Sequence, residues 1–317
     1  MTDTQNEEFK TPVNKIRLFE HGAPGSQNLK LTRKYYTEDM PDGRVKHIVQ
    51  NITDPDIVPY IPDGIGNSTD RQRIPAVLII PGGAFRRLVY NFEGEDVAKW
   101  LNSMGIAAFV LECRLPSDEH DNAEDVPLID AMRAMRVIRG RAQEFGIDEA
   151  KIGVMGFSAG GFMAALLSTA YESDVYVDYK YKDEYDKLSA RPDFAVCSYP
   201  VISIDDCIEA GKRYMSEEQV LERISDSKAK ILHKYNPDKL VRPDMPPVFI
   251  CETDDDRTTL SENSVGFYMA ARKAGVSAEL HIFRTGGHGY GCGDDFAQTG
   301  EWKVLFTKWI KSIGIIS

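Results

Sequence analysis

The sequence lacks the long apolar segments and closely spaced cysteines that mark membrane-spanning or disulfide-rich proteins. Its longest apolar runs, such as 106–111, are far shorter than the roughly 20 residues that cross a bilayer. The 5 cysteines are widely spaced and form no C-x-x-C pair, so no metal site is expected and a reducing compartment is favoured. The polar N-terminus shows no signal-peptide core, which predicts a cytoplasmic location.

Basic residues are also too few for a basic binding surface. The chain carries 38 Lys and Arg against 49 Asp and Glu, a formal net charge of −11. This balance disfavours nucleic acids and anionic membranes as partners. With 42% hydrophobic residues, the 317-residue chain can still bury a sizeable core. The oligomeric state stays open, and a homo-oligomer is compatible with the sequence.

Apolar segments of strand length alternate with segments of helical periodicity along most of the chain. We expect strands at 75–80, 106–112, 151–155, 193–199, 247–251 and 278–283, and helices at 93–104, 128–145, 161–171, 264–274 and 300–313. Because these strands are apolar throughout, both faces of the sheet should be covered. The pattern predicts an α/β fold with a mostly parallel central sheet, helices on both faces and a small helical insert.

The ends and interruptions of this pattern suggest a domain organisation. Residues 1–45 are polar and rich in turn signals, and we expect an irregular segment there before a single domain at 46–317. Residues 173–188 are charged and tyrosine-rich, and residues 205–239 are polar and helix-prone. Each of these two segments is either solvated surface or a small cap beside a functional site.

The most informative motif is Gly156-Phe157-Ser158-Ala159-Gly160, which reads G-x-S-x-G between an expected strand and an expected helix. Glycines at such a turn permit positive φ and close packing of strand against helix. A serine there is exposed at the top of the sheet, where its hydroxyl can attack a carbonyl. The alternative is an ordinary turn in which the serine caps the helix. As a nucleophile, Ser158 would need a base, an orienting acid and oxyanion donors elsewhere.

The candidate base is His288, one of 6 histidines. It lies in the glycine-rich segment 285–291, between the expected strand 278–283 and the last helix. Such a loop allows an imidazole to reach over the end of the sheet. By contrast, His281 lies inside that strand and is expected to be a packed residue.

With these residues in place, the chain resembles the α/β-hydrolase esterases of the acetyl esterase and acetyl-xylan esterase group, which are related to dienelactone hydrolases and to the catalytic domains of prolyl oligopeptidases. The resemblance covers about residues 45–317. It rests on IIPGGAF (79–85), EGEDVAKWLNSMGIAAFVLECRL (93–115), IGVMGFSAGG (152–161), RPDFAVCSYPVIS (191–203), PPVFICETDDD (246–256) and FRTGGHGYG (283–291). It implies the α/β-hydrolase fold, the chain order nucleophile, acid, base, and no cofactor.

The resemblance also implies roles for residues near the strand ends. It assigns the oxyanion loop to Pro81-Gly82-Gly83-Ala84, with the N–H groups of Gly83, Ala84 and Ala159 as donors. It places the acid in Asp254-Asp255-Asp256, where Asp256 is favoured because its spacing to Ser264 fits the family loop best. Asp255 is the alternative. Ala84 departs from the family's third glycine, and the acid loop lacks the usual T-A-D-D.

Together these features predict a serine esterase that cleaves short acyl esters through an acyl-enzyme. Acetyl groups on sugars or xylo-oligosaccharides are implied as substrates by the resemblance alone. The alternatives are a prolyl-oligopeptidase-like peptidase and a non-catalytic ligand-binding protein of the same fold. The residues before strand 75–80 are too few for the propeller of such peptidases, and a non-catalytic protein would usually lack a triad member. Because the imidazole must be neutral to act as base, activity should fall in mild acid.

Overall fold

The fold is built around one large sheet. The computed structural model describes residues 9, 11–65, 73–213, 215–216, 218–220, 229–293 and 298–317. Within these residues, 8 strands pair in the order β1-β4-β7-β5-β8-β9-β10-β11. Their bounds are β1 (Ile16–Arg17), β4 (Asp56–Tyr60), β7 (Ala107–Glu112), β5 (Ile74–Ile80), β8 (Ile147–Phe157), β9 (Ala195–Ser198), β10 (Val248–Thr253) and β11 (Ala278–Phe283). All pairs from β7 to β11 are parallel, and only the β1 and β4 edge is antiparallel. The predicted mostly parallel sheet is confirmed.

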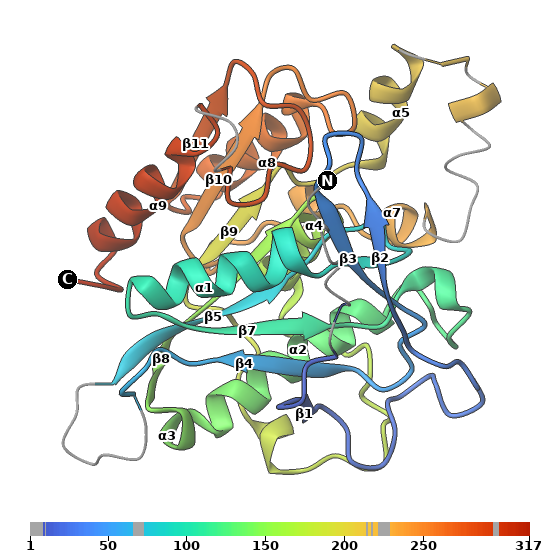
Figure 1. Cartoon of the computed structure of the whole chain (residues 1–317), viewed down its shortest axis with the longest axis vertical. Coiled ribbons are helices and arrows are strands. Elements are labelled where there is room, and N and C mark those ends of the chain that lie inside the picture. Colours follow the sequence, from blue (N-terminus) through green and yellow to red (C-terminus); the bar gives the residue numbers. More distant parts are fainter. Residues whose placement is uncertain are drawn as a thin grey trace, which may run out of the picture.

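Helices cover both faces of this sheet (Figure 1). On one face, α1 (Asp96–Ser103) and α9 (Glu301–Ser312) meet through Trp100 and Trp302, whose ring centroids are 4.9 Å apart. On the other face lie α2 (Val126–Gly140), α4 (Ala159–Ala170) and α8 (Ser261–Lys273). The helix expected at 128–145 is divided, because Arg141 leaves the helical region (φ −103°, ψ 16°) before α3 (Ala142–Phe145) begins.

A small second sheet corrects the expectation for the N-terminal segment. It consists of β2 (Lys34–Asp39), β3 (Val45–Gln50) and β6 (Leu88–Val89), paired antiparallel. The prediction of an irregular segment at 1–45 is wrong for β1 and β2, while residues 1–8 and 10 lie outside the described residues. The sequence of β2, KYYTED, has no apolar alternation because both of its faces are at least partly exposed.

Segment 173–188 packs along the outer side of α2. Arg133 of α2 forms ion pairs with Asp183 and Asp186, the latter at 3.1 Å, and Arg136 donates a hydrogen bond to Tyr176. These contacts attach the segment to the body of the domain. A role as a cap over Ser158 stays a prediction.

In the described part of segment 205–239, the short helices α5 (Ile204–Lys212) and α7 (Ala229–Lys234) lie on the side of the sheet toward which β7 points (Figure 1). Residues 214, 217 and 221–228 lie outside the described residues. Ile231 of α7 is fully buried, and Lys234 Nζ lies 2.7 Å from Asp125 at the start of α2. The segment therefore contributes to the core as well as to the surface, and whether it caps the site stays a prediction.

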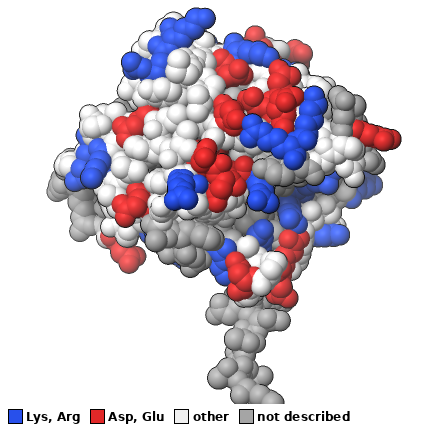
Figure 2. Space-filling model, turned by 90° about the horizontal axis from the view of Figure 1, so that it is seen from above, with Lys and Arg blue, Asp and Glu red and all other residues white. Residues whose placement is uncertain are grey.

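The surface carries charges of both signs. Figure 2 shows acidic and basic side chains interspersed over one face, without a continuous basic area among the residues it colours. In the described part of the chain, no helix combines the length and apolar character needed to span a bilayer.

Candidate active site

Ser158 lies at the sharp turn where β8 passes into α4. Its backbone has φ 55° and ψ −117°, a region that residues with a Cβ seldom adopt. The turn is held by the Ser158 N–H, which donates to the Ser198 carbonyl of β9 at 3.0 Å. A strained backbone at a residue with a reactive side chain is typical of functional sites.

The flanking glycines are required by close backbone packing. A Cβ on Gly156 would lie 1.9 Å from the Gly160 carbonyl oxygen, and a Cβ on Gly160 would lie 1.9 Å from the Ile80 carbonyl oxygen. A side chain at either position would therefore push α4 away from β8 or from β5. The motif fixes where the Ser158 hydroxyl stands relative to the ends of both strands.

The structure brings Ser158, His288 and Asp256 together from three separate loops. His288 Nε2 lies 2.8 Å from Ser158 Oγ, and His288 Nδ1 lies 2.6 Å from Asp256 Oδ2. The His288 loop contains Gly286, Gly287, Gly289 and Gly291, all with positive φ. These glycines allow the sharp path that carries the imidazole back over the end of the sheet.

Asp256 is held as an ionised acceptor. Its Oδ1 accepts the N–H groups of Thr258 at 2.6 Å and Thr259 at 3.0 Å, and its Oδ2 accepts the Thr259 hydroxyl at 2.9 Å. Burial alone would raise the pKa of Asp256, but the hydrogen bond from His288, the charge of His288 and the two backbone N–H groups outweigh it. The pKa of Asp256 is therefore lowered.

Asp255, the alternative acid, has a different partner. Its Oδ1 accepts the N–H groups of Gly286 at 2.9 Å and Gly287 at 2.8 Å. It thereby binds the backbone of the histidine loop, whereas Asp256 binds the imidazole. Of the two adjacent carboxylates, the geometry favours Asp256 as the group that orients His288.

The loop after β5 lies directly beside Ser158. A Cβ on Gly82 would lie 2.9 Å from Ser158 Cβ, so only glycine permits this approach. The next two residues have positive φ, 135° at Gly83 and 57° at Ala84. Among the described residues, the N–H groups of Gly83, Ala84 and Ala159 have no hydrogen-bond acceptor, so they are available as donors.

The buried carboxylate of Glu93, which no local sequence pattern marks, binds the backbone of this loop. Glu93 Oε2 accepts the Gly82 N–H at 2.8 Å, and Glu93 Oε1 accepts the Tyr199 hydroxyl at 2.9 Å. The Tyr199 oxygen in turn accepts the Gly291 N–H of the histidine loop at 3.0 Å. The Tyr199 ring also packs edge-on against His288, with centroids 5.0 Å apart. Glu93 and Tyr199 thus connect the glycine loop after β5 with the loop of His288.

The Glu93 side chain is buried, and its environment alters its protonation. Burial raises the pKa of Glu93, while the charge of His288 and hydrogen bonds from Tyr199 and Gly82 act in the opposite direction. Burial prevails, so the pKa lies above its ordinary value.

A narrow apolar cavity adjoins the proposed oxyanion groups. Its lining includes Gly82 and Ala159 together with Phe85, Leu115 and Met163. Its free volume is only about 10 Å³, about the space that one water molecule occupies.

The chain matches a protein-family model and is similar to known esterases. A protein-family model described as BD-FAE matches residues 65–270. An acetylxylan esterase of Xylanibacter ruminicola is 31% identical over 240 residues, which are 75% of this chain and 45% of that protein. An endo-1,4-beta-xylanase B of Butyrivibrio fibrisolvens is 31% identical over 71% of this chain and 34% of its own length. The chain therefore spans less than half the length of these curated relatives.

Among solved structures, this chain is similar to the acetyl ester-xyloside bifunctional hydrolase from Caldicellulosiruptor lactoaceticus. The two are 38% identical, with a TM-score of 0.67, and the match covers 83% of this chain and 90% of the other. The likeness therefore extends over most of both chains.

Proposed function

This chain belongs to the BD-FAE family and has the α/β-hydrolase fold that its sequence predicts, and on that premise we propose that it is a serine esterase acting on short acyl esters of sugars. The observation that carries the proposal is the continuous contact from Ser158 Oγ to His288 at 2.8 Å and from His288 to Asp256 at 2.6 Å. A nucleophile, a base and an orienting acid at these distances have the geometry of acyl transfer.

In the proposed mechanism, His288 Nε2 takes the proton of Ser158 as Oγ attacks the ester carbonyl. The charged imidazole is stabilised by Asp256, and the tetrahedral oxyanion accepts the N–H groups of Gly83, Ala84 and Ala159. When the intermediate collapses, His288 gives its proton to the departing sugar oxygen and an acyl-enzyme remains. His288 then deprotonates a water molecule that attacks this ester, which releases the acid and restores Ser158.

We propose acetyl as the preferred acyl group and xylo-oligosaccharides as the preferred alcohol. The cavity of about 10 Å³ beside Gly82 and Ala159 favours a small acyl substituent. The names of the Xylanibacter esterase and of the Caldicellulosiruptor hydrolase both refer to acetyl groups and xylose units.

The test is a series of p-nitrophenyl esters from acetate to octanoate, with acetylated xylo-oligosaccharides and a Gly-Pro amide assayed in parallel. We expect the highest kcat/KM for acetate, release of acetate from the oligosaccharides and no cleavage of the amide. Replacing Ser158 by Ala should abolish ester turnover, and turnover that persists in this variant would refute the role of Ser158. Cleavage of the amide alone would indicate a peptidase instead.

We also propose that the protein works in the cytoplasm. Cys113, Cys197 and Cys251 are buried thiols outside any disulfide, which suits a reducing compartment. Fractionation of the source cells with an antibody to the chain would test the location, and recovery from the medium would contradict it.

A further inference from the structure

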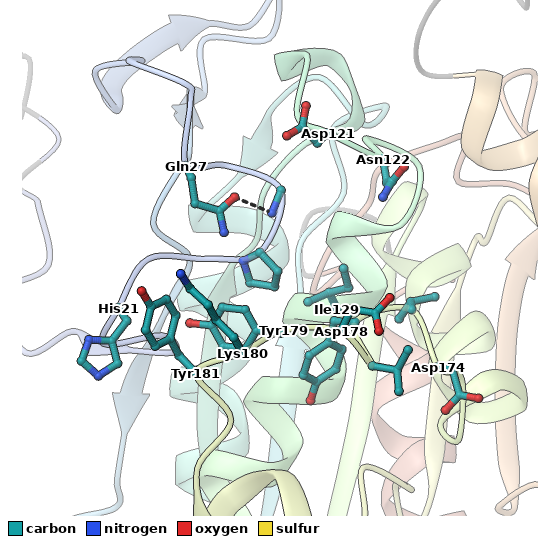
Figure 3. A pocket seen from close by; sticks show the side chains of 15 residues that line it. His21, Gln27, Asp121, Asn122, Ile129, Asp174, Asp178, Tyr179, Lys180 and Tyr181 are labelled. Atoms are coloured by element: carbon teal, nitrogen blue, oxygen red, sulfur yellow. Dashed lines mark hydrogen bonds between the residues drawn. The ribbon is translucent and has the colours of Figure 1, made fainter.

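A hollow of about 540 Å³ lies on the flank of the domain, between segments 21–27, 121–129 and 174–181 (Figure 3). Its volume is within the range of about 300–1,000 Å³ that is usual for ligand pockets. Ile129 of α2 lines this hollow, whereas Pro127 lines the small cavity beside Ala159. Since residues two apart on a helix point about 200° apart, the hollow opens on the opposite side of α2 from that cavity.

Aromatic rings provide part of its wall. Tyr181 is 44% exposed. The ring of His21 packs against it with centroids 4.9 Å apart, and Lys180 Nζ lies 4.7 Å from the Tyr181 ring centroid. The Tyr179 ring stands at 71° to Tyr181, at 5.8 Å, and the Tyr179 hydroxyl is anchored to the Gly22 carbonyl at 2.9 Å. Partly exposed aromatic rings held in fixed positions suit contact with the C–H groups of a sugar.

Polar groups without partners complete the lining. Asp121, Asn122, Asp174 and Asp178 line the hollow, and their side chains make no hydrogen bond or ion pair with other described residues. Carboxylates accept hydrogen bonds from hydroxyl groups, and the Asn122 amide both donates and accepts. The three carboxylates outnumber the Lys180 ammonium in the lining, and the nearby Lys182 ammonium already donates to the Val177 carbonyl at 2.5 Å. This balance disfavours an anionic ligand.

A second hollow of about 270 Å³ adjoins the first. The two share His21, Tyr179, Lys180 and Tyr181, so these side chains form the ridge between them. A ligand that occupied both hollows would pass over the exposed Tyr181 ring. This arrangement favours an extended chain of sugar units over a single small molecule.

We propose that these two hollows bind a neutral oligosaccharide chain outside the active site and so hold a polymeric substrate on the enzyme. The choice of a xylose chain rests on the proposed function. The preference for a neutral, hydroxyl-rich and extended ligand rests on the rings, the unpaired polar groups and the shared ridge. The probe for this second site is therefore unacetylated xylohexaose.

The binding test uses isothermal titration calorimetry on the full chain carrying Ser158→Ala. Adding Tyr181→Ala should weaken xylohexaose binding roughly tenfold, the loss expected for one aromatic stacking contact. Tyr181→Phe keeps the ring and should retain the affinity. Asn122→Gly should also weaken binding, and glycine is chosen because Asn122 has φ 53°. Tyr268→Ala, which changes a half-buried tyrosine on α8, is the control and should bind as the parent chain does.

The kinetic test compares acetylated xylan with p-nitrophenyl acetate in chains that retain Ser158. For Tyr181→Ala, the ratio of kcat/KM on xylan to kcat/KM on the small ester should fall through a higher KM on xylan. Equal xylohexaose affinity in the parent and Tyr181→Ala chains would overturn the second site. The second site would also be overturned if the parent chain were a dimer and Tyr181→Ala were a monomer. The ridge would then be an interface with another copy of the chain. Failure of the wild-type chain to hydrolyse p-nitrophenyl acetate would refute the esterase proposal alone, because the calorimetry needs no turnover.

Discussion

His288 Nδ1 lies 2.6 Å from Asp256 Oδ2, and the neighbouring Asp255 accepts two backbone N–H groups of the loop that carries this histidine. Two adjacent carboxylates thus act on the same loop at different points. One faces the imidazole, and the other fixes the backbone beneath it.

This division predicts different effects for two conservative substitutions. Asp256→Asn should lower kcat roughly 10⁴-fold, because an amide cannot stabilise the charged imidazole and favours the wrong tautomer. Asp255→Asn should have a much smaller effect, because its amide oxygen can still accept both N–H groups. Steady-state kinetics with p-nitrophenyl acetate would measure both. A larger loss in Asp255→Asn would transfer the orienting role to Asp255.

The buried Glu93 predicts a pH-dependent difference in stability. Its raised pKa means that the folded chain holds this proton more tightly than the unfolded chain, whose value is near 4.5. The stabilisation it provides is therefore complete below that value and is lost as pH rises through the folded pKa. Glu93→Gln removes the titration, so the variant should gain stability relative to the parent chain as pH rises.

Urea unfolding at pH 5 and pH 8 would measure this effect. The difference in unfolding free energy between Glu93→Gln and the parent should be more favourable to the variant at pH 8. An identical difference at both pH values would show that Glu93 does not titrate between them.

The narrow cavity beside Ala159 predicts the acyl preference. Met163, 2% exposed on α4, lines it, and Met163→Ala should make room for a longer acyl chain. Each added methylene that is buried contributes about 0.8 kcal/mol, so the butyrate-to-acetate ratio of kcat/KM should rise roughly tenfold. Met135→Ala, at a buried position on α2 outside the cavity lining, should leave the ratio unchanged. Equal ratios in both variants would place the acyl chain elsewhere.

The ion pair between Arg114 and Asp130 predicts a large effect on folding. Both side chains are fully buried, with Nη2 and Oδ1 2.6 Å apart, and Arg114 also contacts Ser26 at 2.8 Å. Arg114→Met should cost about 3–5 kcal/mol of unfolding free energy because it leaves a buried carboxylate without its partner. Adding Asp130→Asn should recover part of the loss, measured by urea unfolding. A double variant that is less stable than Arg114→Met would contradict this account.

Most of the main sheet could be predicted because its strands are buried on both faces and therefore read as short apolar runs. β2 could not, since KYYTED is at least partly exposed on both faces and carries no alternation. The division of the helix at 128–145 was also missed, because Arg141 differs from a helical residue only in its backbone angles.

For the candidate site, the residues in the loops at the strand ends could be predicted from the sequence. The buried residues that hold those loops in place could not. Ser158 and His288 stand out because glycines surround them in loops. Glu93, Tyr199 and Thr259 contact the site only after the chain has folded, and no local pattern distinguishes them. The one available signal was Glu93 itself, a charged residue next to a segment that packs against the sheet. Likewise, the hydrogen-bond partners that distinguish the role of Asp255 from that of Asp256 lie about 30 positions later in the chain.

The antiparallel pairing of β2 with β3 has a practical consequence for fragments of this protein. β3 is also paired with β6, which is separated by three residues from the glycine loop beside Ser158. A fragment trimmed to begin at residue 46 would expose the hydrogen-bonding edge of β3 and invite pairing between molecules. Aggregation of such a fragment would then arise from a missing neighbour strand, and its inactivity would not report on the chemistry of the site.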